Sequence, residues 1–171
     1  PCAKRISHGM ILAEDGRKMS KSFDNVINPD EIIQKHGADT LRLYEMFMGP
    51  FDQAIAWESG AVSGCRKFLD KVWRAFNEKK LTNACPTTEF RKVLARTIKK
   101  VGDDIETFKF NTAVSQLMIL FNELQKADQL PREAAEKICI ILAPFAPHLA
   151  EEIWNKVLGK SDTITYEAWP K

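Results

Sequence analysis

The fold is decided by residues 90–108, which read FRKVLARTIKKVGDDIETF. The apolar residues of this stretch recur in steps of three and four, the spacing that places side chains on one face of an α-helix. Thr87 or Thr88, just after Pro86, suits the N-cap. The predicted stripe consists of Phe90, Val93, Leu94, Thr97, Ile98, Val101, Ile105 and Phe108.

Four further segments in the C-terminal part have the same helical spacing. Asn111 is a candidate N-cap for the second of them, and Pro131 suits the first helical position of the third. Short connections between successive helices are typical of a helix bundle. The four segments cover about residues 60–77, 114–124, 132–142 and 149–157.

The first 58 residues have a mixed pattern. Asp15-Gly16 is a strong turn signal after a short apolar run, and Asn28-Pro29 is a helix start that Gly37 ends. The elements expected are a strand at 10–13, helices at about 29–36 and 39–48, and a strand at 54–57 that returns to pair with the first. The predicted fold class is therefore mainly α: a small mixed α/β appendage, residues 1–58, precedes a helix bundle, residues 59–171.

Composition places the 171-residue chain among folded globular proteins, with 44% hydrophobic and 28% charged residues. Lys plus Arg is 25 and Asp plus Glu is 23, a net charge of +2 that does not by itself imply nucleic-acid binding. The longest apolar run is far shorter than the roughly 18 residues that span a bilayer, which excludes a membrane protein.

The four cysteines lie far apart and the three histidines do not cluster near them, so we expect no metal site. The chain has no signal peptide, which predicts reduced thiols in a cytoplasmic protein. It opens at Pro1 without Met, and we expect it to begin partway through a longer polypeptide. The cysteines are Cys2, Cys65, Cys85 and Cys139.

The chemistry-bearing stretch is the predicted loop at residues 17–25, which reads RKMSKSFDN. Three cations and two hydroxyls within six residues concentrate hydrogen-bond donors suited to a polyanion, and phosphate is the natural guest. A generic basic run of this kind is more often a solvated turn that binds nothing in particular.

This loop resembles a known family signature. Residues 18–22 match the KMSKS signature of class I aminoacyl-tRNA synthetases letter for letter, and three later segments are similar to the leucine enzymes of that family. Those segments are GADTLRL at 37–43, MFMGPFDQ at 46–53 and LAPFAPHLAEEIW at 142–154.

The resemblance implies roles for particular residues. Lys21 would contact ATP and stabilise the transition state of amino-acid activation, with Lys18 assisting. ATP would be a substrate, accompanied by Mg²⁺ in the whole enzyme. Asn25 fits the family pattern, whereas Asp24 stands where the family has Gly and can adopt the left-handed conformation only at some cost. The implied ATP-binding residues are Lys18, Met19, Ser20, Lys21 and Ser22.

The family's other signature, His-Ile-Gly-His, does not occur in this chain. The resemblance therefore implies a C-terminal fragment of a leucyl-tRNA synthetase that is inactive alone. It would supply the signature loop and the tRNA-docking anticodon-binding bundle, while leucine and ATP bind through the missing catalytic domain. The implied partner is tRNA(Leu), with no DNA and no membrane. Two alternatives stay open: a stand-alone RNA-binding helical module, and the same region of a valyl- or isoleucyl-tRNA synthetase.

Candidate tRNA contacts lie on the helix predicted at 60–77. Lys67, Lys71 and Arg74 fall at i, i+4 and i+7, opposite the apolar side chains, and would contact backbone phosphates. Asp70 interrupts this stripe, and a merely solvated face is the competing interpretation. Arg96, Lys99 and Lys100 form a weaker second basic patch.

Several other residues favour structural roles. Periodicity directs Trp57, Trp73 and Trp154 inward, which predicts core packing rather than base stacking. His148, at a helix start, is expected to be structural. A catalytic domain would cover an apolar patch near Ile11, Phe23 and Phe47.

Overall fold

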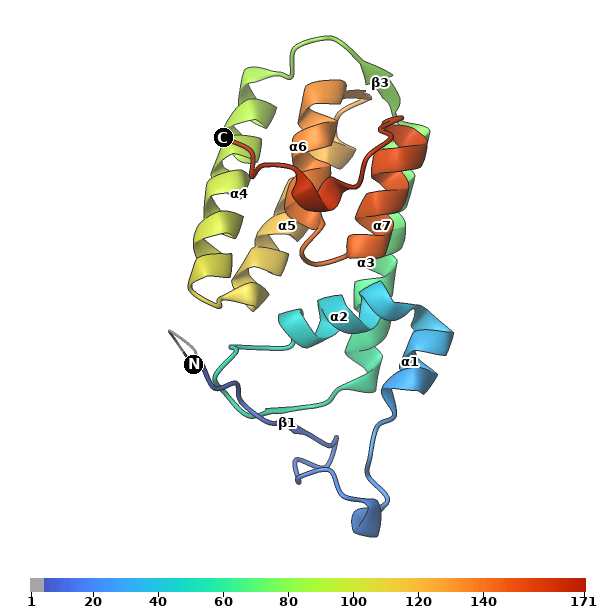
Figure 1. Ribbon diagram of the computed structural model, residues 1–171, viewed down its shortest axis with the longest axis vertical. Coiled ribbons are helices and arrows are strands. Elements are labelled where there is room, and N and C mark those ends of the chain that lie inside the picture. Colours follow the sequence, from blue (N-terminus) through green and yellow to red (C-terminus); the bar gives the residue numbers. More distant parts are fainter. Residues whose placement is uncertain (1–4) are drawn as a thin grey trace.

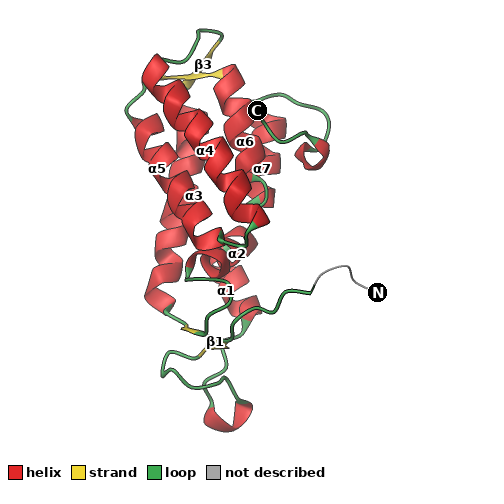
Figure 2. Ribbon diagram, turned by 90° about the vertical axis from the view of Figure 1, so that its left-hand side faces the viewer, coloured by secondary structure: helices red, strands yellow, loops and turns green. Residues whose placement is uncertain are grey.

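The computed structural model describes residues 5–171. A bundle of long helices stands on a smaller part that holds the N-terminal strand (Figure 1). The predicted mainly α fold class is confirmed, and Figure 2 shows how little strand the chain contains. The bundle consists of α3 (Ser59–Glu78), α4 (Thr88–Glu106), α5 (Phe110–Gln125), α6 (Arg132–Leu142) and α7 (Pro147–Glu152), which continues as a π-helical turn, η2 (Ile153–Val157).

Among the bundle helices, the helix starts confirm one predicted cap and correct two other predicted positions. Thr87 caps α4, since its hydroxyl accepts from the backbone N–H of Phe90 at 3.2 Å. Asn111 is not a cap, because the α4–α5 turn closes at Phe108, which has φ +59°, and α5 begins at once after Lys109. Pro131 is the N-cap of α6 rather than its first residue, because it ends a short strand.

That strand, β4 (Gln129–Pro131), pairs in parallel with β3 (Lys80–Thr82) at the end of the bundle remote from the N-terminal strand (Figure 2). Leu81 lies opposite Leu130, and the Leu130 side chain is fully buried. The sequence pattern predicts loops at both places, because three residues are too few to show alternation. The pair ties the α3–α4 connection to the α5–α6 connection.

The core runs through all bundle helices and confirms most of the predicted apolar stripes. Trp57 and Trp154 are buried as predicted, but Trp73 is 36% exposed, because it lies at the edge of the buried face of α3. The C-terminal segment crosses the bundle from α7 toward α4 (Figure 1) and brings Trp169 over Gly102. A Cβ on Gly102 would lie 3.1 Å from the Trp169 indole nitrogen, so a larger residue at this position would require the Trp169 side chain to shift by a few tenths of an ångström.

The appendage contains β1 (Ile11–Leu12), the 3-10 turn η1 (Lys21–Phe23), α1 (Pro29–His36), α2 (Ala38–Phe47) and β2 (Ile55–Ala56). β1 and β2 pair as predicted, in parallel, with Ile11 opposite Ile55. The side chain of Asn28 caps α1 by accepting from Asp30, and Gly37, at φ +89°, ends it. A second 3-10 turn, η3 (Ile164–Tyr166), lies in the C-terminal segment.

Aromatic side chains join the appendage to the bundle. The ring of Phe51, in the loop after α2, lies 5.2 Å from Phe108 and 5.7 Å from Phe110, measured between centroids. The Phe51 contacts hold the base of the appendage against the α4–α5 turn. Within the appendage, Tyr44 of α2 meets Trp57, two residues before α3, edge to face at 4.8 Å.

Cys65, Cys85 and Cys139 are free thiols, while Cys2 lies outside the described residues. Burial raises the pKa of Cys65 to about 11 and that of Cys139 to about 12. No helix within residues 5–171 has the length and apolar character needed to cross a bilayer.

The expected apolar patch is present only in part. Ile11 and Phe23 are exposed, the latter by 56%. Phe47 is instead half-buried, because it packs against the core at the end of α2.

Candidate functional site

The basic loop at residues 17–25 grows from a tight turn after β1. The N–H of Gly16 donates to the Ala13 carbonyl, and the N–H of Ala13 donates to the Arg17 carbonyl, both at 2.9 Å. Gly16 has φ +75°, the left-handed conformation that favours glycine in such a turn. Lys18 then forms an antiparallel bridge with Leu12, so the backbone at the start of the loop is held against β1.

Asn25 holds the two ends of the loop together. Its Oδ1 accepts from the backbone N–H of Ser20 at 2.8 Å, and its Nδ2 donates to the Lys18 carbonyl at 3.4 Å. Ser20 caps η1 by accepting from the N–H of Ser22. Asp24, which ends η1, has φ +49°, so it does adopt the left-handed conformation expected at this position. Asn25 thus sets the loop shape without itself being among the predicted ATP-binding residues.

The three cations of the loop differ in their surroundings. Arg17 pairs with Asp15 at 2.7 Å and lies over the Phe23 ring, 4.8 Å from its centroid. Hydrogen bonds from the Arg17 backbone and side chain lower the pKa of Asp15. Lys18 and Lys21 are exposed, and neither forms an ion pair within the described part of the chain. Both ammonium groups are therefore available to a polyanion.

The other predicted loop residues lie beside these lysines. Met19 is half-buried against the core and anchors the loop, while Ser22 lies in η1 with Lys21. The hydroxyls of Ser20 and Ser22 are 2.8 Å apart. They form a small polar group next to the lysines, at the tip of the loop.

Glu14 connects the loop to the bundle. Its carboxylate accepts from the N–H of Ser59, at the start of α3, at 3.0 Å. Hydrogen bonds from the Ser59 hydroxyl and N–H lower the pKa of Glu14. The preceding N–H, that of Glu58, donates to the Tyr44 hydroxyl at 2.8 Å. Two side chains of the appendage thus occupy the N-terminus of the first bundle helix.

The candidate basic face of α3 comprises Lys67, Lys71 and Arg74. Lys67 and Arg74 are exposed, whereas Lys71 is half-buried and donates to Asn122 of α5. Asp70, which interrupts the stripe, accepts from Arg66 at 2.9 Å, so a fourth cation on α3 offsets its charge. The Arg74 Nε donates to the Asp70 carbonyl at 3.4 Å, which leaves its other donors available.

Comparison with known proteins decides the family. Residues 1–58 match the model described as class I tRNA synthetases (I, L, M and V), and residues 88–171 match the anticodon-binding domain of tRNA ligase. A solved LeuRS of Agrobacterium radiobacter K84, in a ternary complex with tRNA and LeuAMS, is similar at 31% identity over 95% of this chain, with a TM-score of 0.79. The chain belongs to the class I aminoacyl-tRNA synthetases.

The synthetase likeness extends beyond leucine enzymes at the level of fold. The methionyl-tRNA synthetase of Mycobacterium tuberculosis, solved with methionyl-adenylate, has a TM-score of 0.68 at 15% identity. That match covers 87% of this chain and 37% of the methionyl enzyme. The present chain spans 23% of the Agrobacterium LeuRS. As a class I synthetase segment it carries an anticodon-binding domain, and its family uses ATP.

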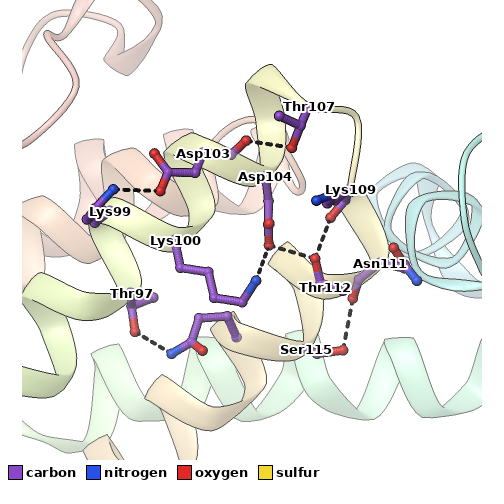
Figure 3. Close-up of polar contacts among 11 residues, drawn as sticks. Thr97, Lys99, Lys100, Asp103, Asp104, Thr107, Lys109, Asn111, Thr112 and Ser115 are labelled. Atoms are coloured by element: carbon purple, nitrogen blue, oxygen red, sulfur yellow. Dashed lines mark hydrogen bonds and ion pairs between the residues drawn. The ribbon is translucent and has the colours of Figure 1, made fainter.

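The second basic patch of this synthetase chain is largely neutralised. Figure 3 shows Lys99 directed to Asp103 and Lys100 to Asp104, each pair 2.7 Å apart on α4. The hydrogen bond from Lys99 to Asp103 raises the pKa of Lys99. Arg96 takes part in neither ion pair. The patch therefore presents fewer unpaired cations to RNA phosphates than the basic face of α3 does.

Sequence reasoning missed the role of Asp39, in the second segment that resembles the family. Its buried carboxylate accepts from the N–H groups of His148 and Leu149, at the start of α7. Nδ1 of His148 also donates to it at 2.8 Å, which agrees with the structural role expected for this histidine. The sequence pattern does not predict this cap, because Asp39 lies more than a hundred positions before the helix start that it caps. Among the described residues, no group of His, Cys, Asp and Glu side chains could hold a metal ion.

Proposed function

We propose that this chain is the signature-loop and anticodon-binding portion of a leucyl-tRNA synthetase, which activates leucine with ATP and ligates it to tRNA(Leu). The observation that carries the proposal is the 31% identity with the Agrobacterium LeuRS over 95% of the chain, against 15% with the methionyl enzyme. The segment at 46–53, around Gly49 and Pro50, adds to the case for leucine. The division into appendage and bundle is proposed at Glu58–Ser59, where α3 begins.

The loop suits the first step, adenylyl transfer. A carboxylate oxygen of leucine attacks the α-phosphorus of ATP, the bond to the β-phosphate oxygen breaks, and pyrophosphate leaves with its electron pair. Negative charge grows on the leaving oxygens, and ammonium groups placed there stabilise the transition state. Lys21 takes this role and Lys18 assists, because both are exposed without a carboxylate partner in residues 5–171. Met19, Ser20 and Ser22 complete the ATP-binding loop.

In the second step, a terminal hydroxyl of tRNA(Leu) attacks the leucyl carbonyl and AMP leaves. The bundle's task is to hold the tRNA body, and Lys67, Lys71 and Arg74 are the proposed phosphate contacts on α3. Mg²⁺ would enter with ATP. We propose a cytoplasmic location, supported by the three free thiols at Cys65, Cys85 and Cys139.

The direct test replaces Lys21 by Ala in the whole enzyme and measures leucine-dependent ATP–pyrophosphate exchange. We expect the rate to fall by about 100- to 1,000-fold, the usual effect of removing one transition-state donor. Lys35→Ala, at an exposed lysine of α1, is the matched control and should exchange at the wild-type rate. An unchanged rate in the Lys21 variant would refute the assigned role.

The amino-acid specificity is tested separately by charging. The whole enzyme is offered leucine, valine, isoleucine and methionine with total tRNA, and we expect leucyl-tRNA alone to accumulate. Accumulation of valyl- or isoleucyl-tRNA would assign the chain to one of those enzymes. An immunoblot that finds a native polypeptide of the size of this chain would instead favour the stand-alone RNA-binding module.

A further inference from the structure

A cavity of about 530 Å³ lies beside the basic face of α3, outside the signature loop. It is bounded by the α1–α2 junction, α3 and α7, which approach one another on one side of the molecule (Figure 1). Leu69 and Leu149 contribute its apolar lining, and Trp73 stands at its wall with about a third of its surface exposed. The volume lies within the range of about 300–1,000 Å³ that is typical of ligand sites.

Hydrogen bonds hold several of the polar groups that line the cavity. Arg66 donates to Asp70 at 2.9 Å and to the His36 carbonyl at 3.2 Å, which orients its guanidinium plane. Glu152 is exposed at the cavity, from the end of α7. The wall therefore offers the Arg66 cation, the carboxylates of Asp70 and Glu152, and the Trp73 indole. It also contains His36, His148 and a third carboxylate, that of Asp39, which already accepts from the start of α7.

This combination suits a base better than a phosphate. Arg66 is already paired with Asp70, and Glu152, which forms no ion pair within residues 5–171, repels a phosphate. Carboxylates instead accept hydrogen bonds from an exocyclic amino group. The exposed indole of Trp73 provides a stacking surface, and every nucleobase has a π-face that can stack on it. Arg66 can donate to a ring nitrogen or carbonyl of the same base.

The cavity is continuous with the proposed phosphate contacts. Arg66 and Trp73 are seven residues apart on α3, and Lys67 and Arg74 each follow one of them by a single residue. The two pairs therefore form neighbouring rows on one helix surface, about two turns long. A strand whose phosphates lie along Lys67 and Arg74 carries its bases within reach of Trp73.

We propose that this cavity receives one unpaired, amino-bearing base of the bound tRNA, stacked on Trp73 and hydrogen-bonded to Asp70 or Glu152. The inference rests on the proposed tRNA binding and adds a base-specific contact to it. Lys67 and Arg74 position the backbone, and the cavity contributes an interaction that depends little on salt.

The test measures tRNA(Leu) affinity of the 171-residue chain across a salt series for wild type, Trp73→Ala, Trp73→Phe and Lys67→Ala. We expect Trp73→Ala to weaken binding about 5- to 100-fold with an unchanged salt slope, and Trp73→Phe to restore most of it. Lys67→Ala should instead lower the slope by about one unit. Tyr166→Ala, which removes an exposed aromatic ring outside the cavity, is the control. Thermal unfolding verifies that each variant is folded.

Chemical probing identifies the base. Dimethyl sulfate and kethoxal modify the pairing edges of unpaired bases, and we expect one base to be protected by wild type and by Trp73→Phe but not by Trp73→Ala. If wild type binds tRNA while Trp73→Ala binds equally well and no base is protected, this inference is wrong and the proposed function stands. If wild type binds no tRNA at low salt, the proposed docking role and this inference both fall.

Discussion

Asp39 in the first turn of α2 caps α7 through Leu149, whose backbone N–H donates to Oδ2 of Asp39 at 2.7 Å. The neighbouring His148 donates to Oδ1 through its backbone N–H at 3.3 Å. Arg42, one turn further along α2, donates twice to the Pro144 carbonyl, at 2.8 and 3.0 Å. The two segments that carry the family resemblance, 37–43 and 142–154, therefore bind each other directly and join the appendage to the bundle.

Replacing Asp39 by Ala should lower the free energy of unfolding by about 2 kcal/mol, because it removes a charged cap and leaves two N–H groups without an acceptor. Urea denaturation monitored by circular dichroism measures this. Asp30→Ala, at an exposed position in the first turn of α1, is the control and should change stability by less than about 0.5 kcal/mol. Equal effects of the two substitutions would contradict the capping role.

The two ion pairs of α4 in Figure 3 form a natural comparison. Both span i to i+4 at 2.7 Å, but the Asp104 side chain is 7% exposed and that of Asp103 is 62% exposed. Asp104 also accepts from Thr112 of α5 at 2.7 Å. We expect Asp104→Ala to cost about 2–3 kcal/mol and Asp103→Ala less than about 0.5 kcal/mol, measured by denaturant unfolding. A similar loss for both would show that burial does not govern these pairs.

Asp24 places a carboxylate at the end of η1, near the lysines of the signature loop. Asp24→Asn removes the charge while keeping a residue that tolerates the left-handed conformation, so we expect tripolyphosphate to bind about 2- to 5-fold more tightly. Asp24→Gly should give at least the same gain, since it also relieves the backbone. Calorimetric titration at low salt measures both, and weaker binding by Asp24→Asn would show that the carboxylate assists the loop.

Acid should weaken the link between the loop and α3. Because the Ser59 hydroxyl and N–H lower the folded-state pKa of Glu14 below its ordinary value of 4.5, ionised Glu14 stabilises the folded chain above that pH. The stabilisation is lost as the pH falls through the folded pKa. Glu14→Gln should therefore be less stable than wild type near neutral pH, with the gap closing below about pH 4. A gap that stays constant in urea titrations from neutral to acid pH would contradict this.

The three described cysteines should differ in the rate at which a thiol reagent modifies them. Burial raises the pKa of Cys65 to about 11 and of Cys139 to about 12, whereas Cys85 is exposed. In a Cys2→Ala chain at mildly alkaline pH, we expect an aromatic disulfide reagent to label one thiol rapidly and the other two only after unfolding. A Cys85→Ser control should remove the rapid phase, and a rapid phase that persists would show that a buried thiol is reached.

Much of this protein was determined by its sequence alone. The apolar spacing of residues 90–108 predicts α4 and its Thr87 cap, because one helix face and one hydroxyl act locally. The signature at 18–22 was recognisable because its five residues are contiguous, while the role of its lysines toward ATP stays a prediction that the family resemblance implies. The Asn28 cap and the Gly37 stop of α1 were equally readable, because each rests on residues that are neighbours in the chain.

Tertiary structure alone decided which distant groups meet. The carboxylate of Asp39 meets Leu149, which lies 110 positions later in the chain, and that of Glu14 meets Ser59, 45 positions later. Strands β3 and β4 likewise pair although the helices α4 and α5 separate them in the sequence. Hydrophobic periodicity carries no information about such distant partners. Packing also decided that Trp73 borders a cavity rather than the core, because it lies at the edge of a helix face that no neighbour fully covers. Local spacing determines which face of a helix is apolar, but only the assembled neighbours determine how far that face is buried.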